Sequence, residues 1–223
     1  PLAALRVHHG GGAAAGGGGG DGASCEGAGE AFVLGLGSEE NASLYSTGSG
    51  LPSDHADYAA LEVAIEYLTG LEGDFWRKIR GLGLAYSYSI RNSPEQKLMS
   101  FTLSRSTDPL RARAAACKIV EDYASGATSL DRAVFDGSIA SLAYANIQAR
   151  GTKSAAQSGQ LGPALAGKPC GYDDAQLRAI LAVTPDAALE ALRRHLVPLM
   201  RAETSCVAIV TPLNKAAEVA RGL

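Results

Sequence analysis

The chain has 223 residues, of which 46% are hydrophobic and 19% are charged, as expected for a globular protein with a sizeable core. Its net charge of −3 at pH 7 argues against a general nucleic-acid-binding protein, because such proteins carry basic surfaces that neutralise phosphate. No run of about 18 apolar residues is present, so the sequence predicts no membrane span.

The first 30 residues have low complexity. Residues 9–23 are almost all glycine and alanine, and such a chain has high backbone entropy and little to bury. We therefore predict that residues 1–30 are a flexible linker or a loop insertion. A phosphate-binding loop is disfavoured, because no strand precedes the glycines and no Gly-Lys-Ser/Thr follows them. The chain starts without Met or a signal-peptide pattern, and we interpret it as a piece of a longer protein.

The folded region is predicted to cover residues 31–223. Its first segment, 31–46, alternates apolar side chains on both faces and predicts a central strand, in which Leu44 and Tyr45 continue the strand after a bulge. A helix follows over about 54–71. Its apolar side chains recur at helical spacing and form one stripe, namely Leu61, Ala64, Ile65 and Leu68.

A short helical turn at 75–80 and an alternating strand at 84–90 come next. A polar turn joins this strand to a second alternating strand at 98–104, so the two are predicted to form an antiparallel hairpin. From Thr107 onward helices dominate, with 151–171 either a mobile loop or a weak helix. The remaining predicted elements are helices at 109–126, 129–148, 175–181, 185–200 and 214–223, and a strand at 205–211.

This order separates strands from helices, which predicts an α+β fold: a mostly antiparallel sheet with helices packed on one face. The cysteines at 25, 117, 170 and 206 are far apart. They therefore lack zinc-site spacing and favour a reducing compartment, with two long-range disulfides as the alternative.

The sequence carries none of the common zinc-peptidase or serine-hydrolase motifs. H-x-x-E-H, H-E-x-x-H and G-x-S-x-G are absent from the sequence. We interpret His8 and His9 as a solvated pair, His55 as a surface residue near acids, and His195 as an exposed or helix-end cation. On its own residues, the chain is not expected to catalyse a reaction.

The stretch from Glu72 to Ile90 carries the most distinctive pattern. It holds the single Trp of the chain, a cluster of basic residues, a glycine turn and a strand. One interpretation is structural, with Phe75 and Trp76 in the core and Arg80 paired with a surface acid. The other is functional: Arg80 before the turn and Tyr86 after it place two hydrogen-bond donors at one edge of a sheet.

This stretch and the helix before it resemble the carboxy-terminal half of inverzincin metallopeptidases, the pitrilysin/insulinase family. The resemblance is closest to the long-chain branch that includes presequence proteases, and it covers about residues 31–223. It is carried by the runs Asp57-Tyr58-Ala59-Ala60-Leu61, Glu66-Tyr67-Leu68, Leu71-Glu72-Gly73, Phe75-Trp76-Arg77, Ile79-Arg80-Gly81 and Gly83-Leu84-Ala85-Tyr86.

The resemblance implies a half-domain that closes with a second half around a chamber. The amino-terminal half, expected on the same chain, would bind the zinc ion of the full enzyme, and no metal is expected in this part. Arg80 and Tyr86 match the family positions that bind the peptide substrate. Ser87, where close relatives often have Gly, and the glycine tract depart from the family pattern.

The expected function is therefore the substrate-binding part of a zinc metalloendopeptidase, inactive by itself. The alternative is a non-catalytic structural or peptide-binding homologue. The expected partners are a peptide and the amino-terminal half, with no nucleic acid. A cytoplasmic location is expected, with mitochondrion or plastid as alternatives.

Overall fold

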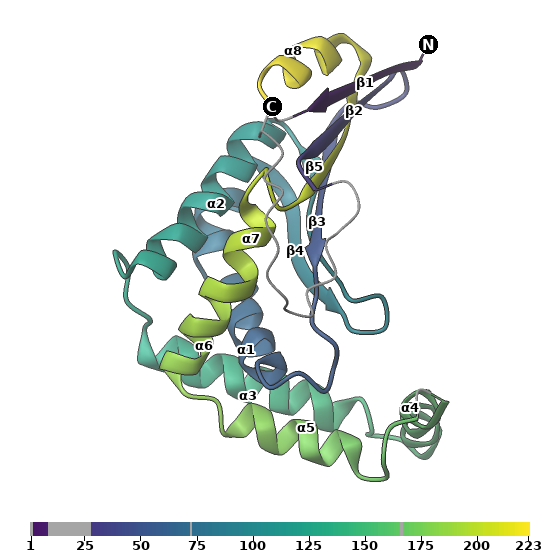
Figure 1. Cartoon of the computed structure of the whole chain (residues 1–223), viewed down its shortest axis with the longest axis vertical. Coiled ribbons are helices and arrows are strands. Elements are labelled where there is room, and N and C mark those ends of the chain that lie inside the picture. Colours follow the sequence, from purple (N-terminus) through teal and green to yellow (C-terminus); the bar gives the residue numbers. More distant parts are fainter. Residues whose placement is uncertain (1, 9–27, 72, 166) are drawn as a thin grey trace, which may run out of the picture.

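The computed structural model describes residues 2–8, 28–71, 73–165 and 167–223. These residues contain a six-stranded sheet in the order β1-β2-β6-β3-β5-β4 (Figure 1). β2 and β6 are parallel and the other neighbouring pairs are antiparallel, which confirms the predicted mostly antiparallel sheet. The strands are β1 (Leu2–His8), β2 (Glu30–Leu36), β3 (Ala42–Ser49), β4 (Ala85–Ser93), β5 (Leu98–Ser106) and β6 (Cys206–Pro212).

The helices lie together on one side of this sheet, as predicted, while α4 stands apart from it (Figure 1). Residues 151–171, predicted as a loop or a weak helix, contain α4. No helix among the described residues is long and apolar enough to cross a membrane. The helices are α1 (Tyr58–Thr69), α2 (Pro109–Ser125), α3 (Arg132–Gln148), α4 (Lys153–Leu165), α5 (Tyr172–Leu181), α6 (Pro185–Ala191), α7 (Val197–Met200) and α8 (Ala216–Arg221), with π-helical η1 (Trp76–Arg80) and η2 (Leu192–Leu196) and 3₁₀-helical η3 (Leu213–Lys215).

Strand β1 lies within the segment predicted to be a linker. It pairs with β2 along its whole length, from Leu2 opposite Leu36 to His8 opposite Glu30. The prediction of a flexible linker is therefore wrong for residues 2–8, because their backbone groups complete the ladder along one side of β2. The glycine tract itself lies outside the described residues.

Residues 31–46 form parts of two strands rather than one strand with a bulge. β2 ends at Leu36, β3 begins at Ala42, and β6 from the far end of the chain lies between them. The segment that separates them, 37–41, contains polar residues and no apolar side chain. β6 pairs with both strands. Two separate strands therefore satisfy more backbone hydrogen bonds than one continuous strand would.

The core fills the space between the sheet and the helices. All members of the predicted α1 stripe are buried, and Phe75 is fully buried. Trp76 is 36% exposed, so its predicted place in the core is wrong. Phe75 and Ile79 are one helical turn apart and both point inward, which leaves Trp76 on the outer side of η1.

Side-chain caps fix the starts of the helices predicted at 109–126 and 185–200. The Asp108 side chain accepts a hydrogen bond from the Arg111 N–H and caps α2, while Thr184 caps α6 in the same way. Helix α2 ends at Gly126, whose φ of 81° is in the left-handed region. Helix α5 follows Gly171 and has Asp173 and Asp174 in its first turn.

Candidate functional site

Arg80 and Tyr86 lie together at the beginning of β4, the last strand of the sheet. Arg80 is the final residue of η1, and Tyr86 is the second residue of β4. The Arg80 guanidinium carbon is 5.0 Å from the centroid of the Tyr86 ring. The two residues singled out in the sequence are therefore neighbours in space, and Tyr86 is 58% exposed.

The π-helical geometry of η1 and the glycine turn bring Arg80 to this position. The Gly81 N–H donates to the Trp76 carbonyl at 2.7 Å, a bond that spans five residues. A Cβ atom at Gly81 would lie only 2.6 Å from the Arg77 carbonyl oxygen, so this close approach requires glycine. Gly83 has a φ of 69° and completes the turn. Short π-helical segments occur frequently at functional sites.

A second guanidinium, that of Arg105, also contacts the Tyr86 ring. The Arg105 guanidinium carbon is 5.7 Å from the Tyr86 ring centroid. Arg105 has a φ of 50° and lies where the pairing of β3 with β5 shifts register, between Leu44 opposite Leu103 and Ala42 opposite Ser106. Such a bulge redirects side chains. Sequence reasoning missed Arg105, because strand alternation gives no signal for a bulge.

The three side chains, Arg80, Tyr86 and Arg105, form a cationic cluster that we call the Arg–Tyr site. Among the described residues, no carboxylate lies within ion-pair distance of Arg80, so the predicted pairing with a surface acid is not observed there. An exposed cation–π contact is worth about 0.5–1 kcal/mol. A ligand with better acceptors can therefore displace either guanidinium from the ring at low cost.

Two hollows are lined by residues of the Arg–Tyr site or of the segment that joins Arg80 to Tyr86. A polar cavity of about 450 Å³ is lined by Arg105 and by residues of the β2–β3 connection, including Glu39 and Glu40. An apolar groove of about 410 Å³ lies between α2 and the segment that joins η1 to β4, where Leu82 and Leu84 line it. The site thus offers hydrogen-bond donors with both polar and apolar surface nearby.

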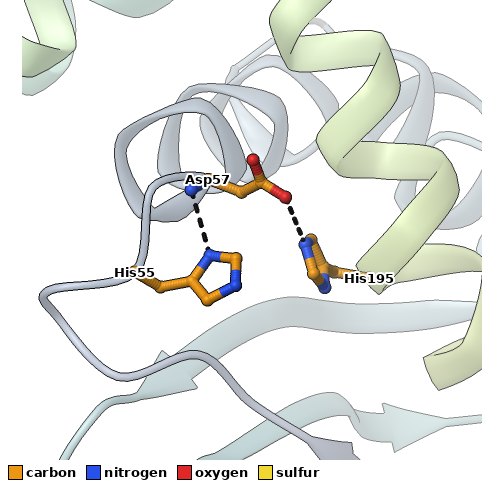
Figure 2. Close-up of side chains that lie close together, drawn as sticks. All are labelled: His55, Asp57 and His195. Carbon is orange, nitrogen blue, oxygen red and sulfur yellow. Dashed lines mark hydrogen bonds and ion pairs between the residues drawn. The ribbon is translucent and has the colours of Figure 1, made fainter. Parts of the chain in front are cut away.

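A second group of polar side chains lies at the start of α1 (Figure 2). His195 Nε2 is 3.0 Å from Asp57 Oδ2, and the Asp57 backbone N–H donates to His55 Nδ1 at 3.0 Å. The two imidazole rings meet edge-on, with centroids 5.7 Å apart. His195 was predicted to be an exposed or a helix-end residue. The exposed alternative is wrong, since its side chain is 17% exposed and bonded to Asp57, but His195 does lie in the last turn of η2.

Pro198 accounts for the position of His195. Proline has no N–H, and its ring clashes with the carbonyl four residues earlier in an α-helix. The helix widens into η2 just before Pro198, and the Val197 N–H donates to the Leu192 carbonyl five residues back. His195 lies within this widened turn, next to Asp57 at the start of α1.

The Asp57 carboxylate is surrounded by positive or potentially positive groups. The hydrogen bond from His195 lowers the pKa of Asp57 below its usual value, nearby His55 and Arg194 lower it further, and partial burial opposes them. Arg194 Nη1 is 3.4 Å from Asp57 Oδ2, while Arg194 Nε donates to Glu190 Oε1 at 2.8 Å. Although Asp57 is the N-cap residue of α1, its side chain makes no capping hydrogen bond.

Comparison with solved structures shows the class of fold. An inactive peptidase domain from Bordetella parapertussis aligns with a TM-score of 0.66 and 11% identity, over 78% of this chain and 92% of that one. A peptidase M16 inactive domain from Pseudomonas fluorescens aligns with a TM-score of 0.60 and 18% identity, over 78% and 41%. Pitrilysin aligns with a TM-score of 0.54 and 14% identity, over 77% and 18%. The chain therefore has the fold of an M16-type inactive peptidase domain.

Two curated proteins are similar in sequence. The uncharacterized protein YOL098C of Saccharomyces cerevisiae is 35% identical over 122 residues, which are 53% of this chain and 12% of the yeast protein. The uncharacterized protein C05D11.1 of Caenorhabditis elegans is 32% identical over 134 residues, 57% of this chain and 13% of that protein. The matched part of this chain thus spans about an eighth of each relative. No protein-family model matches the chain.

Proposed function

We propose that this chain is the substrate-binding carboxy-terminal part of a zinc metalloendopeptidase that degrades peptides in a closed chamber. The observation that carries the proposal is the contact between exposed Arg80 and Tyr86 at the start of edge strand β4. The fold shared with inactive peptidase domains supports it. The sequence contains no H-x-x-E-H, so zinc and the general base are assigned to an amino-terminal half on the same chain.

The chemistry of the Arg–Tyr site suits a peptide. A guanidinium is a permanently charged donor with several N–H groups, which fits the carbonyl oxygens of an extended peptide. The Tyr86 phenol can donate a hydrogen bond to the oxyanion that develops as a peptide bond is attacked. Arg105, which also stacks on Tyr86, adds a second charged donor beside that phenol.

The edge of the sheet offers a way to hold the peptide backbone. β4 is hydrogen-bonded to β5 on one side and has no strand on its other side among the described residues. An extended peptide can add to such an edge as a further strand, and the apolar groove beside Leu82 and Leu84 can take one of its side chains. In this arrangement the backbone provides affinity, while Arg80 and Tyr86 fix the position of one carbonyl.

The lengths of the curated relatives favour a long-chain peptidase of the presequence-protease-like branch. Because 122 residues are 12% of the yeast protein, that protein is about 1,000 residues long. A chain of that length has room for an amino-terminal half before a domain of this size. The zinc site and this domain would then face each other within one polypeptide.

Replacing Tyr86 with phenylalanine tests the role of the phenol. In the complete protein, with its amino-terminal half, we expect Tyr86→Phe to lower kcat for peptide hydrolysis about 100-fold, the usual cost of losing one oxyanion donor. Zinc content should stay unchanged. Tyr45→Phe is the matched control, because Tyr45 is also exposed on the sheet but is not part of the Arg–Tyr site. An unchanged kcat in Tyr86→Phe would show that the phenol has no transition-state role.

A non-catalytic peptide-binding homologue is the second candidate. The absence of H-x-x-E-H from this sequence fits this function as well, because Arg80 and Tyr86 can bind a peptide without any hydrolysis. The complete protein decides between the two. Peptide cleavage that requires zinc supports the peptidase, whereas peptide binding without cleavage supports the binding protein.

A further inference from the structure

We propose that His55, Asp57 and His195 form a binding site for one Zn²⁺ ion. Each of these residues offers one ligand atom, and the three atoms lie within 4.8 Å of one another. In a tetrahedral zinc site with bonds of about 2.0–2.1 Å, ligand atoms are separated by about 3.3 Å. His195 Nε2 and Asp57 Oδ2 already lie at about this separation, 3.0 Å apart, so only His55 has to approach.

The pair formed by Asp57 and His195 is arranged like two ligands that share one ion. The Asp57 carboxylate is not used to cap α1 and points across to His195 (Figure 2). A metal ion would take the place of the proton that now bridges Nε2 and Oδ2, and that proton would move to Nδ1 of the same ring or to solvent. Asp57 then contributes a negative charge, which partly neutralises the ion.

His55 completes the ligand set by a small adjustment. Its Nδ1 accepts a hydrogen bond from the Asp57 backbone N–H, so coordination replaces this one hydrogen bond with a metal–nitrogen bond. The His55 side chain is exposed, and its ring is free to turn toward His195. The released N–H of Asp57 lies at the exposed start of α1, where water can accept its hydrogen bond.

The loop that leads to His55 and Asp57 is held in place by other parts of the fold. Asn92 clamps the loop before α1, because its side-chain amide accepts from the Leu51 N–H at 2.8 Å and donates to the Leu51 carbonyl at 2.9 Å. Gln176 of α5 donates to the Ser53 carbonyl at 3.0 Å. The backbone before His55 and Asp57 is thus preorganised, which reduces the entropy lost when an ion binds.

There is also room for solvent and for a further ligand. A cavity of about 290 Å³ is lined by His195, Arg194 and Glu203, among others. Three protein ligands leave the fourth tetrahedral position of zinc open, and a water molecule in this cavity can occupy it. His55 is exposed, so an ion can reach the site from solvent.

The ligand types select the kind of metal. Two imidazoles and one carboxylate suit Zn²⁺ and neighbouring transition-metal ions, whereas Mg²⁺ and Ca²⁺ prefer sites built from oxygen atoms alone. Arg194 opposes binding, because its guanidinium lies 3.4 Å from Asp57 Oδ2 and repels a cation. Glu190 draws the same guanidinium away through its bond to Nε. Removing the charge of Arg194 should therefore strengthen zinc binding.

Zinc titration of the 223-residue chain by calorimetry tests the site. We expect one Zn²⁺ per chain, at least 100-fold weaker binding in His195→Ala and in Asp57→Asn, and several-fold tighter binding in Arg194→Gln. Two ligand variants are tested, so that the conclusion still holds if one of them fails to fold. Circular dichroism of each variant without metal checks the fold.

The matched control is the double variant His8→Ala/His9→Ala, which removes the neighbouring histidines near the start of the chain and should bind zinc as the parent chain does. Co²⁺ should compete with Zn²⁺ and give a visible absorption band that is lost in His195→Ala. The proposal is overturned if the parent chain binds no zinc, or if binding persists in both His195→Ala and Asp57→Asn. Because no peptide is involved, the outcome is independent of the proposed peptidase function.

Discussion

Replacement of Phe75 with alanine is expected to lower the free energy of unfolding by about 3–5 kcal/mol, the usual cost of removing a buried aromatic ring. Phe75 is fully buried and contacts Tyr88 and Phe101 edge-on, with ring centroids 5.6 and 6.1 Å apart. Its removal leaves a cavity between η1 and the hairpin of β4 and β5. Urea unfolding followed by circular dichroism measures the loss.

Trp76→Ala is the matched control for that experiment. The two residues are adjacent in η1, but Trp76 is 36% exposed, so its removal should cost about 1 kcal/mol or less. Phe75→Ala should also weaken peptide binding at the Arg–Tyr site, because Phe75 anchors the helix that ends at Arg80. Equal destabilisation by the two substitutions would contradict the packing described for η1.

Deprotonation of Glu62 is expected to lower the free energy of unfolding by about 3 kcal/mol as the pH rises from about 4.5 to above 7. Burial, and then the negative charge of Glu66, raise the pKa of Glu62 from 4.5 to about 7. The folded chain therefore holds the Glu62 proton more tightly than the unfolded chain does. This contribution is fully present below pH 4.5 and is lost as the pH rises through the folded-state pKa.

Glu62→Gln removes the titrating group and should flatten this part of the stability profile. The variant should gain stability relative to the parent chain at pH 8 but not at pH 5, as measured by urea unfolding at both values. Glu121→Gln, at an exposed position on α2, serves as a control that should leave the profile unchanged. A profile with the same slope in Glu62→Gln and the parent chain would show that Glu62 ionises normally in the fold.

The sequence was enough to predict those helices and strands that are determined by residues within or next to the element itself. The hairpin of β4 and β5 followed from side-chain alternation around a polar turn, and α2 followed from its cap and its final glycine. β1 could not be predicted in this way, because what orders it is pairing with β2. The division between β2 and β3 depends on β6, which comes more than 150 residues later.

At the candidate sites, too, the sequence revealed contacts between nearby residues but not contacts between distant ones. Arg80 and Tyr86 are six residues apart and share one turn, so a local motif was enough to find them. Arg105 joins them only because of a bulge in β5. Asp57 and His195 are separated by 138 residues and meet where η2 packs near the start of α1. No spacing pattern in the chain signals a contact of that kind.

A crystal structure of the complete protein with a bound, uncleavable peptide tests the central claim most directly. Peptide binding at the Arg–Tyr site predicts an Arg80 N–H and the Tyr86 hydroxyl within about 3.2 Å of peptide carbonyl oxygens, with the peptide running along the edge of β4. A peptide bound elsewhere, with Arg80 still stacked on Tyr86, would contradict the claim.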